Sequence, residues 1–152
     1  GLSWRGGTAK TRRKLRSPAS AELAAMLRTP DTRWVSLQYD ATPAEIEALA
    51  ATAGVAVHGW PEAIDDYDET AALLCALDLT VSVCTAVIHL GGALGRPVWV
   101  MAPYSPEWRY GLYWERMPWY PSVRVLRQAS PGAWGGLLQR VTNELAACAP
   151  PL

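Results

Sequence analysis

The chain has 152 residues, of which 50% are hydrophobic, and this is enough for one domain with a buried core. Its apolar runs are all shorter than the ~18 residues of a membrane-spanning helix and no signal peptide is visible, so we expect a soluble, cytoplasmic protein without a transmembrane segment. Three cysteines, Cys75, Cys84 and Cys148, are an odd number without metal-ligand spacing, which argues against a disulfide framework and a zinc site.

The net charge is zero, but the charges are segregated. Residues 1–17 hold six of the fourteen basic side chains and no acid, whereas residues 62–69 hold five acids. The basic segment either binds an anion or is a solvated loop, and its composition alone does not decide between the two. Because the chain has no other basic stripe, we expect no nucleic acid as a partner.

Strand and helix signals alternate along the chain. Ser17 with Pro18 predicts an N-cap and a first-turn proline, residues 42–45 predict a capping box, and Asp68 is expected to cap a third helix. The helix that begins near Thr85 is apolar nearly all round and is therefore expected to be buried. In chain order we expect strand 1–4, a loop at 5–16, helix 17–28, strand 33–38, helix 43–53, strand 55–58, a helix from 68 to about 78, strand 79–83, helix 85–94, strand 97–101, strand 123–126 and helix 134–147.

This alternation predicts an α/β fold, a Rossmann-like, three-layer α/β/α domain with a mostly parallel sheet of about six strands over residues 1–152. In such open sheets, ligands bind beyond the carboxyl ends of the strands. That edge would gather the loop 5–16, the turn 82–85 and the start of segment 102–121. This last segment is rich in Trp and Tyr and too long for an ordinary connection, so we expect it to be functional or to pack on another surface. Since the chain starts at Gly1 in a strand-like stretch, we also expect it to be a piece of a longer protein.

At residues 82–85 a buried strand is expected to turn directly into a buried helix. The first amide groups of that helix and its positive dipole end would stabilise an anion. Thr85 either caps the helix or donates its hydroxyl to a phosphate, and His89 either points into the same space or bonds a backbone carbonyl in the core. Gly91 and Gly92 are expected to allow close helix–sheet packing, since the sequence contains no G-x-G-x-x-G fingerprint, Walker loop or G-x-S-x-G elbow.

Residues 82–100, SVCTAVIHLGGALGRPVWV, resemble the (D/S)T-x-x-x-H-L-x-x-A-L-G-x-P-V motif of family nine glycosyltransferases, the lipopolysaccharide heptosyltransferase group. Three further stretches agree: W-x-G…R-S from Trp4 to Ser17, the acidic helix 66–78, and P-x-W-R…P-W-Y-P-S-x-R-x-x-R-Q at 106–128. The chain is more similar still to the glycosyltransferase-like domains that follow tetratricopeptide repeats in bacterial proteins. The resemblance covers almost the whole chain and implies the C-terminal half of a GT-B enzyme, which holds the nucleotide-sugar donor.

The resemblance also implies roles for single residues. Thr85 and the backbone after it, at Ala86, would meet the diphosphate of the donor. His89 would lie near the sugar or the phosphate. Arg16, with Lys14 as the alternative, would supply a cation from the loop after the first strand. The catalytic residue is not identified, because the acceptor-binding half that normally carries the base would lie outside this chain.

The loop of Trp108 and Arg109 would border the same cleft. No metal and no other cofactor is expected, because GT-B enzymes stabilise the leaving diphosphate with helix dipoles and basic side chains. Cys84 stands where the family usually has Asp, which puts it at the donor site, and its alternative role is that of a small buried hydrophobe.

The expected function is donor binding in a glycosyltransferase that transfers a sugar from a nucleoside diphosphate sugar to an unknown acceptor. Without the acceptor-binding half, the chain alone would bind the donor and not transfer the sugar. The alternative is a degenerate, non-catalytic domain that acts as an interaction module. In both cases the expected partner is an upstream acceptor domain or tetratricopeptide repeats.

Overall fold

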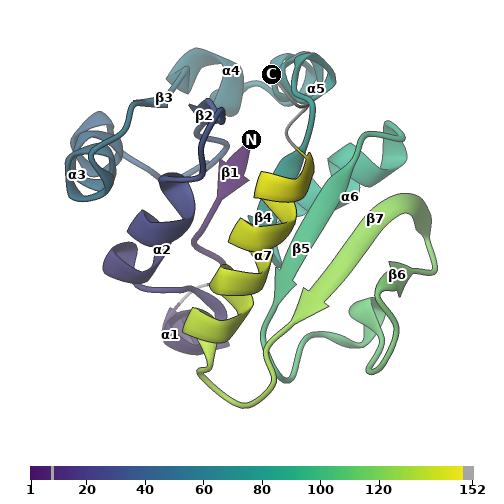
Figure 1. The fold of residues 1–152 in the computed structure, drawn as a ribbon. Helices are drawn as coiled ribbons and strands as arrows, with labels where there is room; N and C mark the ends of the chain where they lie inside the picture. The colour runs from purple at the N-terminus through teal and green to yellow at the C-terminus, as the bar shows by residue number, and fades with distance from the viewer. Residues whose placement is uncertain (8, 149–152) are drawn as a thin grey trace.

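The protein alternates short strands with helices around a central sheet (Figure 1). The computed structural model describes residues 1–7 and 9–148. None of the helices in these ranges combines the length and apolarity needed to cross a membrane. The elements are β1 Leu2–Ser3, η1 Ala9–Thr11, α1 Arg13–Arg16, α2 Ser20–Leu27, β2 Trp34–Val35, α3 Pro43–Ala53, β3 Val57–His58, α4 Pro61–Asp65, α5 Tyr67–Ala76, β4 Thr80–Val83, α6 Ala86–Ala93, β5 Val98–Ala102, η2 Trp108–Tyr110, β6 Arg116–Met117, β7 Tyr120–Arg127 and α7 Trp134–Cys148.

The main sheet has five strands in the order β1-β4-β5-β7-β6. All of its pairs are parallel except β6 with β7, which is antiparallel. Strands β2 and β3 form a separate parallel pair, and one parallel bridge from Leu2 to Ser36 joins it to β1. The predicted α/β class and the mostly parallel sheet are therefore confirmed. The prediction of one sheet with about six strands is not confirmed, because the pairing between β1 and β2 is reduced to this single bridge.

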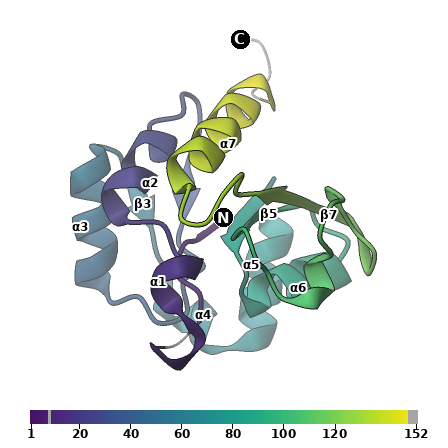
Figure 2. The ribbon, with the colours of Figure 1, turned by 90° about the horizontal axis from the view of Figure 1, so that it is seen from below.

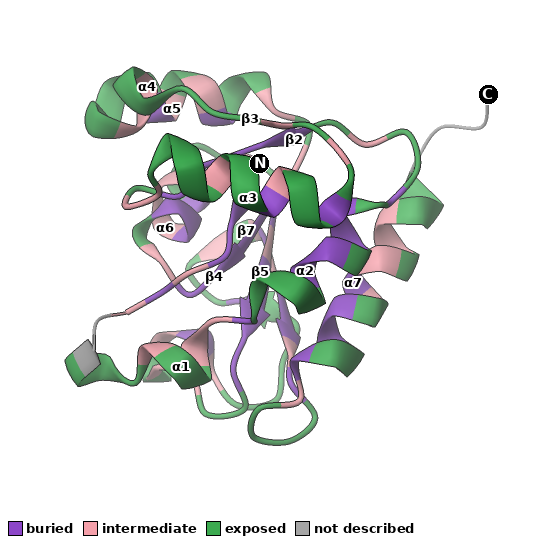
Figure 3. Cartoon of the chain, turned by 90° about the vertical axis from the view of Figure 1, so that its left-hand side faces the viewer, coloured by how far each residue is buried: buried purple, intermediate pink, exposed green. Residues whose placement is uncertain are grey.

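Helices cover both faces of the sheet. Helices α2, α3 and α7 pack together on one face, and α5 and α6 lie on the other, as the two views in Figures 1 and 2 show. Alternate residues of β5 serve the two faces: Met101 packs with the α2–α7 side, whereas Val98 and Val100 pack with Ile88 of α6. Strands β1, β2, β4 and β5 are buried almost throughout, whereas the outer faces of α3 and α7 are exposed (Figure 3).

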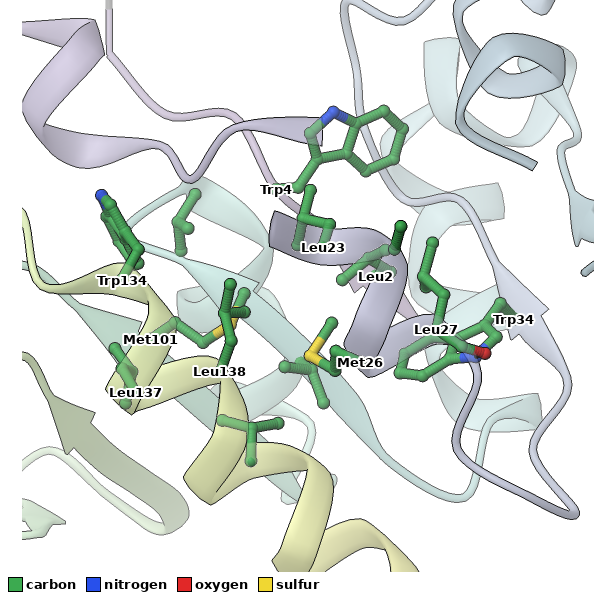
Figure 4. Packing of buried hydrophobic residues seen from close by; sticks show 14 of the residues in the cluster. Leu2, Trp4, Leu23, Met26, Leu27, Trp34, Met101, Trp134, Leu137 and Leu138 are labelled. Atoms are coloured by element: carbon green, nitrogen blue, oxygen red, sulfur yellow. Dashed lines mark hydrogen bonds between the residues drawn. The ribbon is translucent and has the colours of Figure 1, made fainter. Parts of the chain in front are cut away.

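The largest hydrophobic cluster lies between α2, α7 and the sheet (Figure 4). Leu23, Met26 and Leu27 of α2 meet Leu137 and Leu138 of α7 over strands β1 and β5, and all five side chains are buried. Burial of this apolar surface is the main force that holds these helices against the strands, and a buried hydrogen bond from Trp34 Nε1 to the Leu27 carbonyl oxygen adds to it on the α2 side.

The helix starts follow local hydrogen bonding. At α3 the predicted cap is confirmed, since the Thr42 hydroxyl accepts from the Glu45 amide at 3.3 Å and the Glu45 carboxylate accepts from the Thr42 amide at 2.9 Å. The prediction of a cap at Ser17 was wrong: α2 begins after Ala19, and the Ser17 hydroxyl instead accepts from a loop amide. The prediction for Asp68 was also wrong, because Asp66 caps α5.

Two glycines let α6 approach the sheet closely, as predicted. A Cβ at Gly91 would lie 2.7 Å from Val98 Cγ2, and one at Gly92 would lie 2.8 Å from Tyr120 Cβ. Both distances are too short for non-bonded carbon atoms. Only glycine therefore fits where α6 crosses β5 and β7.

Candidate functional site

A cleft of about 400 Å³ opens at the carboxyl edge of the sheet. Strands β1, β5 and β7 run in the same direction, so the loops that follow them meet at this edge. Each loop contributes one group of lining residues: Thr11, Arg12, Leu15 and Arg16 after β1; Pro103, Tyr104, Ser105, Pro106 and Glu107 after β5; and Gln128, Pro131 and Gly132 after β7.

Arg16 links three of the loops at this edge. Its guanidinium forms an ion pair with Glu107 and donates to the Cys84 carbonyl oxygen, with Nη2 3.3 Å from that oxygen. Its Nε atom is buried and has no partner among the residues described. The predicted cation of the first loop therefore lies beside the turn that leads into α6.

The start of α6 has the predicted strand-to-helix turn. Thr85 occupies the cap position, but its side chain makes no capping bond. The Ser82 hydroxyl donates to the Val83 carbonyl oxygen at 2.7 Å, so the contact of 3.0 Å between the two hydroxyls has Thr85 as its donor. The first amides of α6, including that of Ala86, lack an acceptor within the helix. The backbone, and not the Thr85 hydroxyl, is therefore the free donor at this turn.

Cys84 is buried directly before this turn, with 5% of its surface exposed. Burial, and next the nearby negative charge of Glu107, raises the pKa of its thiol to about 12. The thiol is thus protonated at neutral pH and is a poor nucleophile. This environment agrees with the alternative in which Cys84 acts as a small hydrophobe.

His89 lies one turn into α6 and is half-buried between two tyrosines. Its ring centroid is 6.1 Å from that of Tyr110 and 5.8 Å from that of Tyr120. Burial and the positive charge of Arg109 lower its pKa, so the ring is neutral at pH 7. No hydrogen bond of this ring is found within the described part of the chain, which leaves the backbone-carbonyl alternative without support.

The remaining predicted residues lie around the cleft without lining it. Lys14 is exposed and forms no ion pair with a described residue. Trp108 is 76% exposed and packs edge-on against Trp119, with ring centroids 6.1 Å apart. Of the predicted donor-site residues, Arg16 is the one that lines the cleft.

Much of the basic segment holds the loop after β1 in place. Arg5 pairs with Asp40 at 3.0 Å and with Glu45 at 2.7 Å, and Arg13 pairs with Asp40 at 3.3 Å. The hydrogen bond from Arg5, followed by that from the Thr42 amide, lowers the pKa of Glu45 to about 2. These contacts tie the segment to the start of α3 and leave Arg16 as the cation directed toward α6.

Sequence reasoning missed three polar groups at this edge: Glu107, Arg127 and Gln128. They carry buried atoms without a partner in the described residues, namely Glu107 Oε2, Arg127 Nε and Nη1, and Gln128 Nε2. Burial lowers the pKa of Arg127, whose Nη2 donates to the carbonyl oxygens of Tyr110 and Trp114. The available signal was their place, because Arg127 is the last residue of β7 and Gln128 follows it at the carboxyl edge.

This arrangement is suited to an anion that bears hydroxyl groups. The Arg16 guanidinium and the first backbone amides of α6 lie at one turn, and the Glu107 carboxylate and the Gln128 side-chain amide belong to residues that line the adjacent cleft. No group of three or more His, Cys, Asp or Glu side chains in the described ranges is placed to hold a metal ion. At this edge the Cys84 thiol is protonated and the His89 imidazole is neutral at pH 7, while Arg16 and Glu107 form an ion pair.

Fold and site together define an α/β domain with a mostly parallel sheet and a cationic cleft at its carboxyl edge. No family model matches the chain, and no solved structure matches it. The chain is 38% identical over 124 residues to Protein FlbA of Caulobacter vibrioides. The match covers 79% of this chain and 20% of FlbA, so the chain spans about a fifth of the length of that relative.

Proposed function

We propose that this domain binds a nucleoside diphosphate sugar as the donor-binding part of a glycosyltransferase. The observation that carries the proposal is the place of Arg16, whose guanidinium lies against the Cys84 carbonyl beside the first amides of α6. A diphosphate at this turn would accept hydrogen bonds from the amides and from Arg16, and the helix dipole would stabilise its charge.

The strand order supports a Rossmann-like fold, which is the fold expected for one half of a GT-B enzyme. Across the single bridge between Leu2 and Ser36 the strands follow the order β3-β2-β1-β4-β5-β7, which corresponds to the 3-2-1-4-5-6 order of doubly wound dinucleotide-binding folds. A second cleft, of about 270 Å³, lies at the carboxyl ends of β2 and β3. Its lining includes Tyr39 and Trp60, whose rings offer stacking surfaces for a base.

In sugar transfer, negative charge develops on the leaving diphosphate. The amides of α6 and the Arg16 guanidinium would stabilise that charge, which lowers the barrier most when the donors are fixed in advance. Glu107 fixes Arg16 here through the ion pair. Transfer itself needs an acceptor and a base, which we assign to a part of the protein outside this chain.

Binding of free nucleoside diphosphates tests the proposal. We expect at least one of UDP, GDP, ADP and CDP to raise the melting temperature, since a ligand at 100 times its Kd stabilises a fold by ~2.7 kcal/mol. Arg16→Met should weaken that binding by ~10- to 100-fold, because a hydrogen bond to a charged group contributes ~1.5–3 kcal/mol. Lys14→Met, which removes an exposed cation of the same loop, is the matched control and should change Kd less than threefold. The proposal fails if no diphosphate at millimolar concentration has an effect, or if both variants lose affinity equally.

A second candidate function is a non-catalytic interaction module. The observation that favours it is the exposure of aromatic side chains in segment 102–121, where Trp108, Tyr113 and Trp114 are 76%, 86% and 70% exposed. Cys84→Asp separates the two functions, because it places a carboxylate near the charges of Arg16 and Arg127, which act on this thiol. A changed affinity for nucleoside diphosphates supports donor binding, and an unchanged affinity favours the interaction module.

A further inference from the structure

The cleft holds a buried amide whose donors are unused. Gln128 is only 4% exposed, and its Oε1 accepts from the Tyr104 amide at 3.1 Å. That bond fixes the orientation of the side-chain amide, because the reverse orientation would set two donors against each other. The Nε2 group has no partner among the residues that the structure describes, although Gln128 lines the cleft. A buried donor left unpaired is unfavourable, so such a group calls for a partner from outside the described residues.

A carboxylate oxygen with unused capacity lines the same cleft. Glu107 gives its Oε1 to Arg16, and its Oε2 is buried with no partner in the described residues. Residues that line the cleft therefore carry three buried polar atoms without a partner in the described chain: the donors Gln128 Nε2 and Arg16 Nε and the acceptor Glu107 Oε2. A hydroxyl group satisfies both kinds of partner, because it donates one hydrogen bond and accepts others.

The walls of the cleft suit the apolar face of a sugar ring. Pro103, Pro106 and Pro131 line it together with Leu15 and the half-exposed ring of Tyr104. The C–H groups of a pyranose pack against such rings while its hydroxyls face the polar groups. The volume of about 400 Å³ lies in the range of ~300–1,000 Å³ that small-molecule sites occupy.

We infer that this cleft is a sugar site, in which Glu107 Oε2 accepts from one ring hydroxyl and Gln128 Nε2 donates to another. The inference rests on the proposed function, since it names the groups that hold the sugar of the donor whose diphosphate lies at α6. Arg16 connects the two sites, because it pairs with Glu107 in the cleft and contacts the Cys84 carbonyl at the turn. Gln128 then acts as a specificity residue for the sugar and is not needed to hold the diphosphate, whereas Glu107 has a second role because it also fixes Arg16 through the ion pair.

The first experiment compares nucleotides with and without a sugar, by calorimetry on the chain. The pairs are UDP with UDP-glucose, GDP with GDP-mannose and ADP with ADP-glucose. The variant is Gln128→Met, which keeps the length of the side chain and removes both the Nε2 donor and the Oε1 acceptor of the Tyr104 amide. For the nucleotide that binds, we expect the sugar form to bind about tenfold more tightly, the effect of one or two net hydrogen bonds. Gln128→Met should abolish this gain and leave the Kd of the free diphosphate unchanged. Gln139→Met, at an exposed position of α7, is the control and should keep the gain.

The second experiment separates the sugar site from the proposed function. Saturation-transfer NMR with millimolar glucose, mannose, galactose and N-acetylglucosamine reports binding of a sugar without any nucleotide. Transfer to at least one sugar that is lost in Gln128→Met supports the inference, even if no nucleoside diphosphate binds and the proposed function fails. The inference of a sugar site is overturned if none of the four sugars shows saturation transfer, or if the two members of every nucleotide pair bind with equal affinity. It is also overturned if N-acetyl-alanine methylamide shows transfer in place of the sugars, a result that would assign the cleft to a peptide.

Discussion

Replacing Gly92 with alanine tests the close approach of α6 to the sheet. A Cβ at this position would lie 2.6 Å from Cδ2 and 2.8 Å from Cβ of Tyr120. Alanine favours a helix over glycine by ~1 kcal/mol, whereas overpacking costs ~1–3 kcal/mol. Because the displaced atoms lie next to the β7 backbone and cannot rotate away, we expect the upper end of this cost and a net loss of ~1–2 kcal/mol. For a chain of this size that loss lowers the melting temperature by ~2–8 °C.

Thermal unfolding followed by circular dichroism measures this effect. Gly136→Ala is the matched control, since Gly136 also stands in a helix, α7, and a Cβ there meets no atom within 4 Å. The control should gain up to ~1 kcal/mol from helix propensity and melt at a higher temperature. If Gly92→Ala raised the melting temperature as Gly136→Ala does, the packing of α6 on Tyr120 would be wrong.

Two further predictions follow from the pKa values. The pKa of Glu45 is about 2, below the usual 4.5, because of the hydrogen bond from Arg5. The ionised carboxylate therefore stabilises the fold above about pH 4.5, and this contribution is lost as the pH falls from there toward about 2. The urea midpoint of Glu45→Gln should therefore fall less over this range than that of the wild type, and an equal fall would contradict the pairing. Cys84, with its pKa near 12, should not react with a thiol reagent in the native state, whereas the exposed Cys75 and Cys148 should react. The measurement counts the thiols that react with the reagent before and after urea is added. Three rapidly reacting thiols in the native chain would show that Cys84 is accessible.

Local signals in the sequence predicted the elements whose determinants lie close together. The cap at Thr42 involves only residues 42–45, so the capping box could be recognised without a fold. The cap expected at Asp68 moved to Asp66 because residues 61–65 form their own short helix, α4, and α5 begins directly after it. The strand expected from residue 123 begins at Tyr120, since it pairs there with Met117 of β6, a two-residue edge strand too short to leave a pattern.

Features of this edge could be predicted from the sequence only where the residues that form them are close together in the chain. The turn into α6 follows from a strand and a helix start that are adjacent in the sequence, and the cation of the first loop was implied by the family resemblance; the structure brings Arg16 to that turn. The meeting of the loop 5–16 with the start of segment 102–121 was predicted from the strand order, but the parts of Glu107 and Gln128 in the cleft were missed, because these residues follow different strands and meet only through the parallel register of β5 and β7. The ion pair between Arg16 and Glu107 was missed for the same reason, since it depends on which strand ends are neighbours.

The most direct test of the account is to observe which amides respond to a diphosphate. In a ¹⁵N-labelled chain titrated with a nucleoside diphosphate, the amide resonances of Ala86 and Val87, the first two residues of α6, should shift most, together with the side-chain Nε–H of Arg16. The same titration of Arg16→Met should need a higher ligand concentration for the same shifts. Shifts confined to other parts of the chain, with Ala86 and Val87 unmoved at saturation, would contradict the central claim that the diphosphate lies at the start of α6.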